Sequence, residues 1–534
     1  MSGDRILAID VGTQSVRALV FDPRGRPTAT AKVPITPYVV AQPGWAEQNP
    51  ELYWRSIGEA CRRLWAADGT VDGTVDGTAD DARHSVRPTD IAGVTMTTLR
   101  DTVVCADATG RPLRPAIVWL DGRRTEDPPT PRFPFNAAFR VLRVTDTVRA
   151  LAADTDATWI SRNEPDVWAA TARYGLVSGW LTSRLVGRWV DSVACQVGHL
   201  PFDFKALTWA RDGDWKWQIS PIRRDQLPEL IPAGGLLGEL TQGAADHLGV
   251  PAGLPLIAAA GDKQAEAIGA GALEPTIGAI SYGTTATFAT THTRYVEAIP
   301  LVPPYPAGVP GRYSLELNIY RGYWLVDWFR RELGAPEVAR AGAVGHEPEE
   351  LFDELIAATP PGAMGLVLQP TWSPGVRFPG PEAKGAIIGW GDVHTRAHLY
   401  RAILEGIAYA LREAMERSER RTKVRVTELR VSGGGSRSPG ALRLTADIFG
   451  LPVGRPHTHE TAGLGAAVVA SVGLGIHPDI ETAVREMTHV VERIEPDPTA
   501  RAVYDDLYRS VYRRIYPRLR PLYEDIRRIT GYPR

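Results

Sequence analysis

The sequence predicts an α/β protein of two similar domains, and this expectation rests on two segments of the same construction. Residues 6–21 read as an apolar strand, a turn at Gly12-Thr13 and a returning strand, and residues 278–288 repeat this plan around Gly283-Thr284. Glycine lets such a turn approach a phosphate closely, and the N–H and hydroxyl groups that follow can donate to its oxygens. One such hairpin is ordinary. Two copies about 270 residues apart indicate duplicated domains that hold one nucleotide from both sides.

Length and composition favour a soluble protein with more than one core. A chain of 534 residues exceeds what a single hydrophobic core organises. The formal net charge of −2 provides no basic field that would recruit nucleic acid or an anionic membrane. The three cysteines form no CxxC pair, which fits a reducing compartment. The N-terminal residues lead directly into a strand without a signal peptide, so we expect a cytoplasmic location.

We place the domain boundary before Leu254, so the first domain covers residues 1–253 and the second covers residues 254–534. Within the first domain, residues 68–86 repeat Val-Asp-Gly-Thr and contain almost no large apolar side chain. Such a segment cannot bury enough apolar surface to fold. We therefore expect a solvated insertion that is dispensable for stability and activity.

Several helices are expected from apolar spacing. Residues 51–67 and 396–422 predict amphipathic helices, and the glycine-containing run 462–476 predicts a helix that packs closely but is too short to span a bilayer. The tail predicts a further helix, which Pro517 and Pro521 should kink or interrupt because proline has no backbone N–H.

The segment from Thr158 to Trp217 is rich in tryptophan. A platform for stacking sugars or bases is one interpretation of these side chains. Their irregular spacing favours the packing of helices in a large domain instead.

Motifs that are absent exclude common classes. The chain has no GxxxxGK[ST] sequence, no GxGxxG fingerprint and no GxSxG elbow, which argues against P-loop enzymes, conventional dinucleotide folds and serine hydrolases. The cluster His457-Thr458-His459-Glu460 lacks a partner cluster at a recognisable spacing, so it does not predict a metal site.

Asp262 is the candidate catalytic residue. An apolar strand delivers this carboxylate through Gly261 to the start of a small-residue helix. Taken alone, Asp262 would be interpreted as a helix N-cap. Because it precedes the second Gly-Thr turn so closely, we interpret it as the base that accepts the proton of an attacking hydroxyl during phosphoryl transfer.

Other segments supply candidate contacts. Asp10, at the end of the first strand, could hold Mg²⁺ or its bound water. The glycine turn 433–435 offers backbone that can lie against an adenine or ribose. Trp45 suits the apolar face of a sugar, and Arg100-Asp101 combines a forked donor with an acceptor for vicinal hydroxyls, although a surface ion pair explains the latter equally well.

Together these elements resemble the FGGY family of carbohydrate kinases over nearly the whole chain. The similarity is carried by seven motifs in the family's order: Asp10 to Arg17, Trp45 to Pro50, Ala116 to Arg123, Gly261-Asp262, Tyr282 to Thr284, Gly433 to Gly435 and Glu460 to Ala467.

The resemblance implies two actin-like ATPase (ribonuclease H-like) domains with an interdomain cleft, ATP and Mg²⁺ as cofactors, and phosphorylation of a small sugar or polyol. It implies that Asp262 is the base, that Asp10 serves the metal, and that the two Gly-Thr turns and the glycine turn hold the nucleotide. The residues expected at the cofactor are Asp10, Gly12, Thr13, Gln14, Ser15, Arg17, Gly283, Thr284, Thr285, Gly434, Gly435 and Ser438. Those expected at the acceptor are Trp45, Arg100, Asp101, Trp119, Asp262 and Lys263.

Two departures from the family pattern bear on the acceptor. Arg100-Asp101 is nearer to the Arg-Glu of glycerol kinase than to the Met-His-Gly of xylulokinase, and Lys263 stands where glycerol kinase has glutamine. We therefore expect a short polyol or an open-chain ketose, phosphorylated on a primary hydroxyl. Lys263, unless it faces solvent, favours an acceptor other than glycerol, with extra hydroxyls or a carboxylate.

Two other interpretations share the nucleotide motifs: a non-catalytic or chaperone-like ATP-binding protein of the actin and heat-shock superfamily, and a kinase-derived regulator. The acceptor-side residues argue against the first, and only an assay excludes the second. No nucleic acid or membrane partner is expected, and a homodimer is left open.

Overall fold

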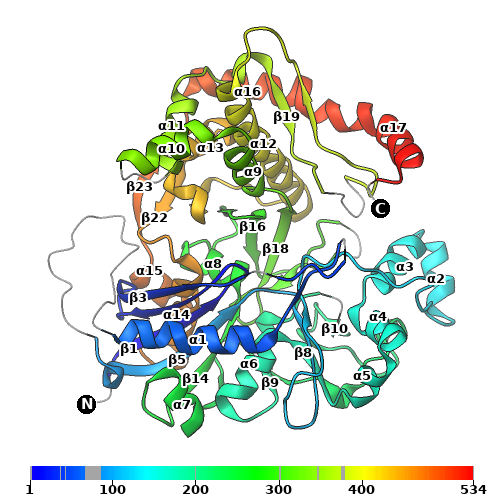
Figure 1. Ribbon diagram of the computed structural model, residues 1–534, viewed down its shortest axis with the longest axis vertical. Coiled ribbons are helices and arrows are strands. Elements are labelled where there is room, and N and C mark those ends of the chain that lie inside the picture. The colour runs from blue at the N-terminus through cyan, green and yellow to red at the C-terminus, as the bar shows by residue number, and fades with distance from the viewer. Residues whose placement is uncertain are drawn as a thin grey trace. The chain divides into compact units, whose positions relative to one another are not determined.

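The computed structural model describes residues 3–36, 38–42, 44–66, 86–198, 200–299, 302–344, 348–373 and 379–532 (Figure 1). The predicted insertion at 68–86 lies outside the described residues, apart from Val86. The chain divides into two compact units, each assembled from three segments. Unit 1 comprises Met1–Gly271, His292–Ser314 and Glu460–His489, and unit 2 comprises Ala272–Thr291, Leu315–His459 and Val490–Arg534.

The main sheet of unit 1 combines an antiparallel meander with parallel strands. The first strand pairs antiparallel with the second and parallel with the fifth, which in turn pairs parallel with the fourteenth. The order across the sheet is β13(Leu236–Glu239), β14(Pro255–Gly261), β5(Ile91–Thr98), β1(Arg5–Val11), β2(Ser15–Phe21) and β3(Pro27–Pro34). Since β14 lies inside this sheet, the division of the chain at Gly271 differs from the boundary that we predicted before Leu254.

The main sheet of unit 2 repeats this plan. Its first hairpin is antiparallel, and β15 then pairs parallel with β21, which pairs parallel with β22. Apart from the two-residue strand β17(Tyr305–Pro306) at its edge, the order is β18(Tyr313–Ile319), β16(Ala286–His292), β15(Ile277–Tyr282), β21(Glu428–Ser432), β22(Val453–Pro456) and β23(Val490–Ile494). Each of these strands from β18 to β23 has a counterpart in the order of the first sheet. The duplication and both predicted hairpins are thus confirmed.

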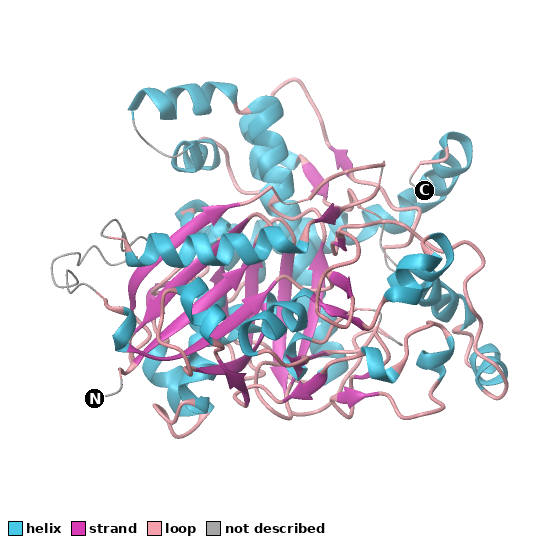
Figure 2. Cartoon of the chain, turned by 60° about the horizontal axis from the view of Figure 1, so that its bottom comes forward, coloured by secondary structure: helices cyan, strands magenta, loops and turns pink. Residues whose placement is uncertain are grey.

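Helices cover the strands of unit 1, as the cyan and magenta ribbons of Figure 2 illustrate. Helix α1(Pro50–Trp65), blue in Figure 1, packs on β2 and β3 through a buried side that includes Ile57, Cys61 and Leu64. Its N-terminus is capped by Asn49, which accepts a hydrogen bond from the backbone N–H of Glu51. The predicted amphipathic helix at 51–67 is therefore confirmed.

Helix α14(Thr461–Gly473), from the C-terminal part of the chain, packs against β1, β5 and β14 and against α8(Asp262–Gly269). The two helices cross at glycines. A Cβ atom on Gly465 would lie 1.8 Å from the carbonyl oxygen of Ala265, and one on Gly269 would lie 2.0 Å from that of Thr461. The close packing predicted for residues 462–476 is confirmed, and it depends on the absence of side chains at Gly465 and Gly269.

The remaining elements of unit 1 include a small sheet and the tryptophan-rich region. Trp180 is fully buried, and Trp159 packs in a cluster with Trp45, Trp168, Trp209 and Trp217. The tryptophans therefore serve packing, as expected. The elements are β4(Glu47–Gln48), β6(Val103–Ala106), β7(Ala116–Ile117), α2(Phe135–Val141), α3(Thr145–Ala153), α4(Asp156–Asn163), α5(Pro165–Ala170), β8(Arg173–Leu176), α6(Val177–Val186), β9(Val190–Ser192), β10(Phe202–Asp203), β11(Thr208–Trp209), β12(Glu229–Ile231), α7(Gln242–Leu248), β17(Tyr305–Pro306) and α15(Ile480–Met487).

The core of unit 2 is built around the long helix α12(Arg396–Thr422), as predicted. The tail helix α17(Arg513–Thr530) runs through Pro517 and Pro521. The expected interruption is wrong, because the burial of Ile515, Tyr516 and Tyr523 anchors the helix on both sides of the prolines. The other elements are α9(Trp324–Leu333), α10(Ala335–Val344), α11(Pro348–Ala357), β19(Val367–Gln369), β20(Ala386–Ile388), α13(Pro439–Phe449) and α16(Pro498–Leu507).

Within the described ranges, no helix has the length and apolarity needed to cross a membrane.

Candidate active site

The first hairpin of unit 1 brings a carboxylate and a guanidinium together. Asp10 and Arg17 are directly opposite each other in the β1–β2 register, and Nη1 of Arg17 donates to Oδ2 of Asp10 at 2.8 Å. Nε of Arg17 also lies 3.3 Å from a carboxylate oxygen of Glu460, the residue that precedes α14. Burial raises the pKa of the Asp10 carboxyl, and the positive charge of Arg17 opposes that rise.

The turn of this hairpin joins the expected phosphate residues to an expected acceptor residue. The N–H of Gly12 donates to the carbonyl oxygen of Ser15 at 3.0 Å, which closes the turn with Gln14 exposed at its tip. The indole N–H of Trp119 donates to Oγ1 of Thr13 at 3.1 Å. The structure therefore places Trp119 beside the turn itself.

Asp262 begins helix α8. The N-cap of this helix is Gly261, so Asp262 is its first helical residue and not its cap. Its Oδ1 accepts the backbone N–H of Lys263 at 2.8 Å and lies 3.3 Å from Nε of Arg100. Burial raises the pKa of the Asp262 carboxyl, while the charges of Arg100 and Lys263 lower it. The side chain of Asp262 keeps 30% of its surface exposed, so a ligand can reach it.

Lys263 forms an ion pair within the same helix. Its Nζ lies 2.9 Å from Oε2 of Glu266, three residues on. Burial lowers the pKa of Lys263, but the negative charges of Glu266 and Asp262 outweigh it and the net pKa is raised. The Lys263 side chain therefore stays charged. Sequence reasoning missed Glu266, although a carboxylate three residues after a lysine on a helix is a recognisable signal.

The other acceptor-side residues are held by contacts within unit 1. The guanidinium of Arg100 lies over the ring of Tyr305, 5.1 Å from its centroid. Asp101 has a φ of +52°, a backbone conformation that non-glycine residues rarely adopt. A Cβ on Gly198 would meet the Asp101 carboxylate at 1.8 Å, so Asp101 requires a glycine beside it.

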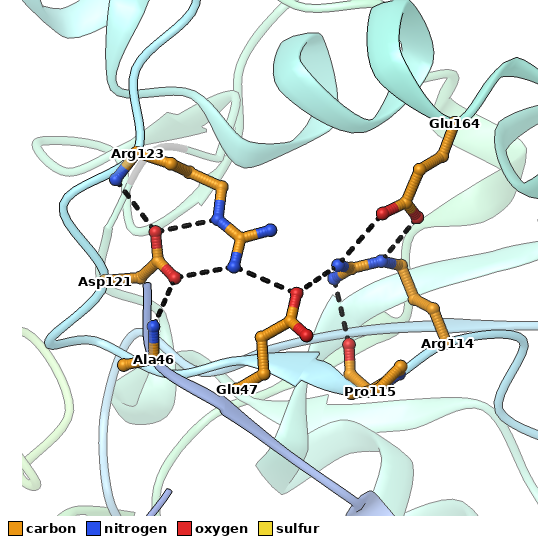
Figure 3. Close-up of polar contacts among 7 residues, drawn as sticks. All are labelled: Ala46, Glu47, Arg114, Pro115, Asp121, Arg123 and Glu164. Carbon is orange, nitrogen blue, oxygen red and sulfur yellow. Dashed lines mark hydrogen bonds and ion pairs between the residues drawn. The ribbon is translucent and has the colours of Figure 1, made fainter. Parts of the chain in front are cut away.

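The ring of Trp45 packs against Arg123, a member of the buried charge network that Figure 3 shows. The guanidinium of Arg123 lies over this ring, 4.0 Å from the centroid, and Trp159 packs edge-on at 5.2 Å. Arg123 also donates to both carboxylate oxygens of Asp121 and to Glu47. One face of Trp45 is thus covered by Arg123.

Glu47 links this arginine to a second one. Its Oε1 accepts from Arg123 at 2.9 Å and from Arg114 at 2.6 Å, and Arg114 pairs in turn with Glu164 (Figure 3). Both arginine side chains are at most 5% exposed. Sequence reasoning did not identify this network, because its members come from distant segments.

In unit 2, the second turn packs against the start of α9. The N–H groups of Tyr323 and Trp324 donate to the carbonyl oxygens of Gly283 and Thr284 at 3.0 and 3.3 Å. The hydroxyl of Thr285 lies 3.4 Å from the carbonyl oxygen of Tyr320.

The glycine turn of unit 2 has one open face. Among the residues that the structure describes, nothing lies within 4 Å of a Cβ placed on Gly434, whereas one on Gly435 would meet the ring of Tyr323 at 2.2 Å. Ser438 caps α13, since its hydroxyl accepts the N–H of Ala441 at 2.9 Å and donates to Asp353. Open space at Gly434 suits a flat ligand, while Gly435 is required by packing.

Comparison with known proteins decides the family. Models of the N-terminal and C-terminal domains of the FGGY family of carbohydrate kinases match residues 5–269 and 278–474. The chain belongs to this family. The "Uncharacterized sugar kinase YgcE" of Escherichia coli is 28% identical to this FGGY kinase over 510 residues, which cover 95% of this chain and 92% of that protein. The glycerol kinase of Leptothrix cholodnii is 31% identical over 502 residues, which cover 89% and 92%.

Solved structures agree. A xylulose kinase from Rhodospirillum rubrum superposes with a TM-score of 0.77 at 26% identity, over 97% of this chain and 100% of that one. The predicted two-domain, actin-like fold and the resemblance to FGGY kinases are therefore confirmed. The protein is an ATP-dependent kinase that acts on a sugar or polyol, and the chaperone-like alternative has no support.

Proposed function

We propose that this FGGY kinase phosphorylates a primary hydroxyl of a short, neutral polyol or open-chain ketose, with Asp262 as the base. The observation that carries the proposal is the position of Asp262 at the start of α8, accessible and 3.3 Å from Arg100. Glycerol kinases and a xylulose kinase among the relatives act on acceptors of this size, as their names state.

In the proposed reaction, the acceptor oxygen bonds to the γ-phosphorus of ATP and the bond to the departing ADP oxygen breaks. The proton of the acceptor hydroxyl passes to the Asp262 carboxylate, which must be ionised to receive it. The positive charges of Arg100 and Lys263 favour that ionised form. Arg100 and Asp101 hold the neighbouring hydroxyls, and Trp119 borders the acceptor.

Each unit, taken by itself, has residues that we propose as nucleotide contacts. In unit 1 these are Asp10, Arg17 and the turn from Gly12 to Ser15, and in unit 2 they are the turn from Gly283 to Thr285 and Gly434. Ser438 would act by capping the helix that follows the glycine turn.

Mg²⁺ is expected with ATP and fits Asp10, because this ion commonly uses one or two carboxylates together with substrate phosphates. Within the described residues no cluster of three or more His, Cys, Asp or Glu side chains could hold a metal alone. The ion would neutralise phosphate charge.

Lys263 gives less support to an acidic acceptor than its sequence position alone indicated. Its charge is matched by Glu266 at 2.9 Å, so a carboxylate on the acceptor is not needed to compensate it. We accordingly favour a neutral acceptor. A cytoplasmic location and a homodimer stay predictions.

The experiment is a screen of C3 to C7 polyols, ketoses and sugar acids by ADP release, with Asp262→Asn alongside. The variant keeps the size of the side chain but removes the proton acceptor. We expect kcat to fall by roughly 10²–10⁴-fold with little change in ATP affinity. Near-normal turnover would show that Asp262 is structural, and no ADP release with any acceptor would point to the kinase-derived regulator.

A further inference from the structure

Gln264, the third residue of α8, carries a buried amide that the proposed mechanism does not use. The residue is 2% exposed, and neither Oε1 nor Nε2 has a hydrogen-bond partner among the residues that the structure describes. An unpaired buried amide destabilises a fold, and native proteins keep few of them. An amide with both ends unpaired beside a reactive carboxylate therefore calls for a functional explanation.

The amide lies at the junction that carries Asp262. A Cβ built on Gly261 would be 3.1 Å from Oε1 of Gln264 and 2.8 Å from Cγ of Arg100. The same arginine reaches Asp262 through its Nε. Gln264, Arg100 and Asp262 thus surround one strand-to-helix junction within unit 1.

A purely structural explanation is available and can be compared with the contacts. Glutamine at this helical position often closes a capping box by accepting the N–H of the N-cap residue. Here the N-cap is Gly261, and no such hydrogen bond forms. Capping therefore leaves both ends of the amide unexplained.

We infer that Gln264 is a specificity-determining residue of the acceptor site, which pairs with the hydroxyl next to the one that is phosphorylated. A hydroxyl both donates and accepts, so one or two adjacent hydroxyls can satisfy Oε1 and Nε2 together. A carboxylate only accepts and would leave Oε1 unpaired. The inference rests on the proposed function and narrows its acceptor to a neutral vicinal diol.

Access to the amide requires the side chain of Arg100 to move. In the structure the stem of Arg100 borders Gly261 and its guanidinium contacts Asp262. An acceptor hydroxyl that takes over Asp262 releases that contact, so Arg100 can turn toward another hydroxyl of the acceptor and uncover the amide.

The test compares acceptor pairs that differ by one hydroxyl: glycerol against 1,3-propanediol, and ribitol against 2-deoxyribitol. A site built to bind a hydroxyl rejects the analogue that lacks it by a large factor. We expect the parent to prefer the full polyol by at least roughly 10²-fold in kcat/KM, and Gln264→Leu to reduce that ratio by at least roughly 10-fold. If Gln264→Leu folds poorly, Gln264→Met replaces it in the test, because methionine is unbranched like glutamine. We expect the same reduction of the ratio in that variant.

Gln226 provides a matched control. It is fully buried in unit 1, but its Nε2 donates to the carbonyl oxygen of Thr171 and its Oε1 accepts the N–H of Arg223, both at 2.9 Å. Gln226→Leu should lower the melting temperature and leave the acceptor ratio unchanged. Gln264→Leu should keep or raise the melting temperature, because it removes an amide that has no bond to lose.

The outcomes separate the two ideas. The inference alone would be overturned if the parent is active and both Gln264 substitutions leave its acceptor ratio unchanged. It would also be overturned if Gln264→Leu lowers the melting temperature without changing that ratio. A parent that phosphorylates no acceptor in the wider screen would overturn the proposed function and this inference with it.

Discussion

Substitution of Gly465 by alanine tests whether the crossing of α8 and α14 positions the end of α8 that carries Asp262, the proposed base. The new Cβ would lie 1.8 Å from the carbonyl oxygen of Ala265 and 2.9 Å from the backbone nitrogen of Gly269. Ordinary contact begins near 3.4 Å, so the helices must separate by about 1.6 Å, the difference between these two distances. The obstacle is backbone, which cannot rotate away as a side chain would.

Two effects of this separation are expected. Overpacking of a core typically costs 1–3 kcal/mol, and a clash with backbone puts Gly465→Ala at about 3 kcal/mol of unfolding free energy or more. Because α8 starts at Asp262, its displacement also moves the proposed base, and a misplacement of about 1 Å can reduce turnover by roughly 10²-fold. Thermal and urea unfolding measure the first effect, and steady-state kinetics measure the second.

Gly243→Ala is the control. Gly243 also lies in a helix, α7, but no atom of the described part of the chain lies within 4 Å of its Cβ position. Alanine there should change the unfolding free energy by no more than about 1 kcal/mol, in the stabilising direction. If Gly465→Ala unfolded like the parent and kept full activity, the reasoning about the crossing would be wrong.

Two further predictions concern charges of unit 1. Burial raises the pKa of Asp262 above its ordinary 3.8, so kcat/KM should fall on acidification at a higher pH than for a free aspartate. Arg100→Gln removes a charge that lowers this pKa, so the acidic limb of the pH–rate profile should move to still higher pH. An acidic limb that does not move would contradict the assignment. Glu47→Gln leaves two buried arginines short of a partner and should cost about 3 kcal/mol in urea unfolding. Glu59 also faces two arginines, but on the exposed side of α1, so Glu59→Gln should leave the urea unfolding midpoint nearly unchanged; equal losses would show that burial does not matter here.

The sequence was informative where the signal is local. The two hairpins, the helix at α1 and the strand that delivers Asp262 each depend on patterns of alternating or helical spacing within about 20 residues. They were predicted correctly. The competing interpretation of Asp262 was a helix N-cap, and the structure has Gly261 in that position instead. The role of Asp262 as the base stays a proposal.

Long-range partners could not be predicted from local patterns. Glu460 meets Arg17 across more than 400 positions of sequence, and Glu47 joins Arg114 and Arg123 only after β4 and β7 have paired. The boundary before Leu254 differs from the division in the structure for the same reason. Nothing near Leu254 reveals that β14 will be the neighbour of β5.

The discontinuity of unit 1 has a consequence for biosynthesis. Helix α14 packs on three strands of the N-terminal sheet, yet its last residue is number 473 of 534. During translation, therefore, the apolar side of β1, β5 and β14 has no native cover until most of the chain has left the ribosome. Such surface invites aggregation or chaperone binding. A nascent chain stalled near residue 271 should be held by chaperones although every strand of its main sheet has been synthesised.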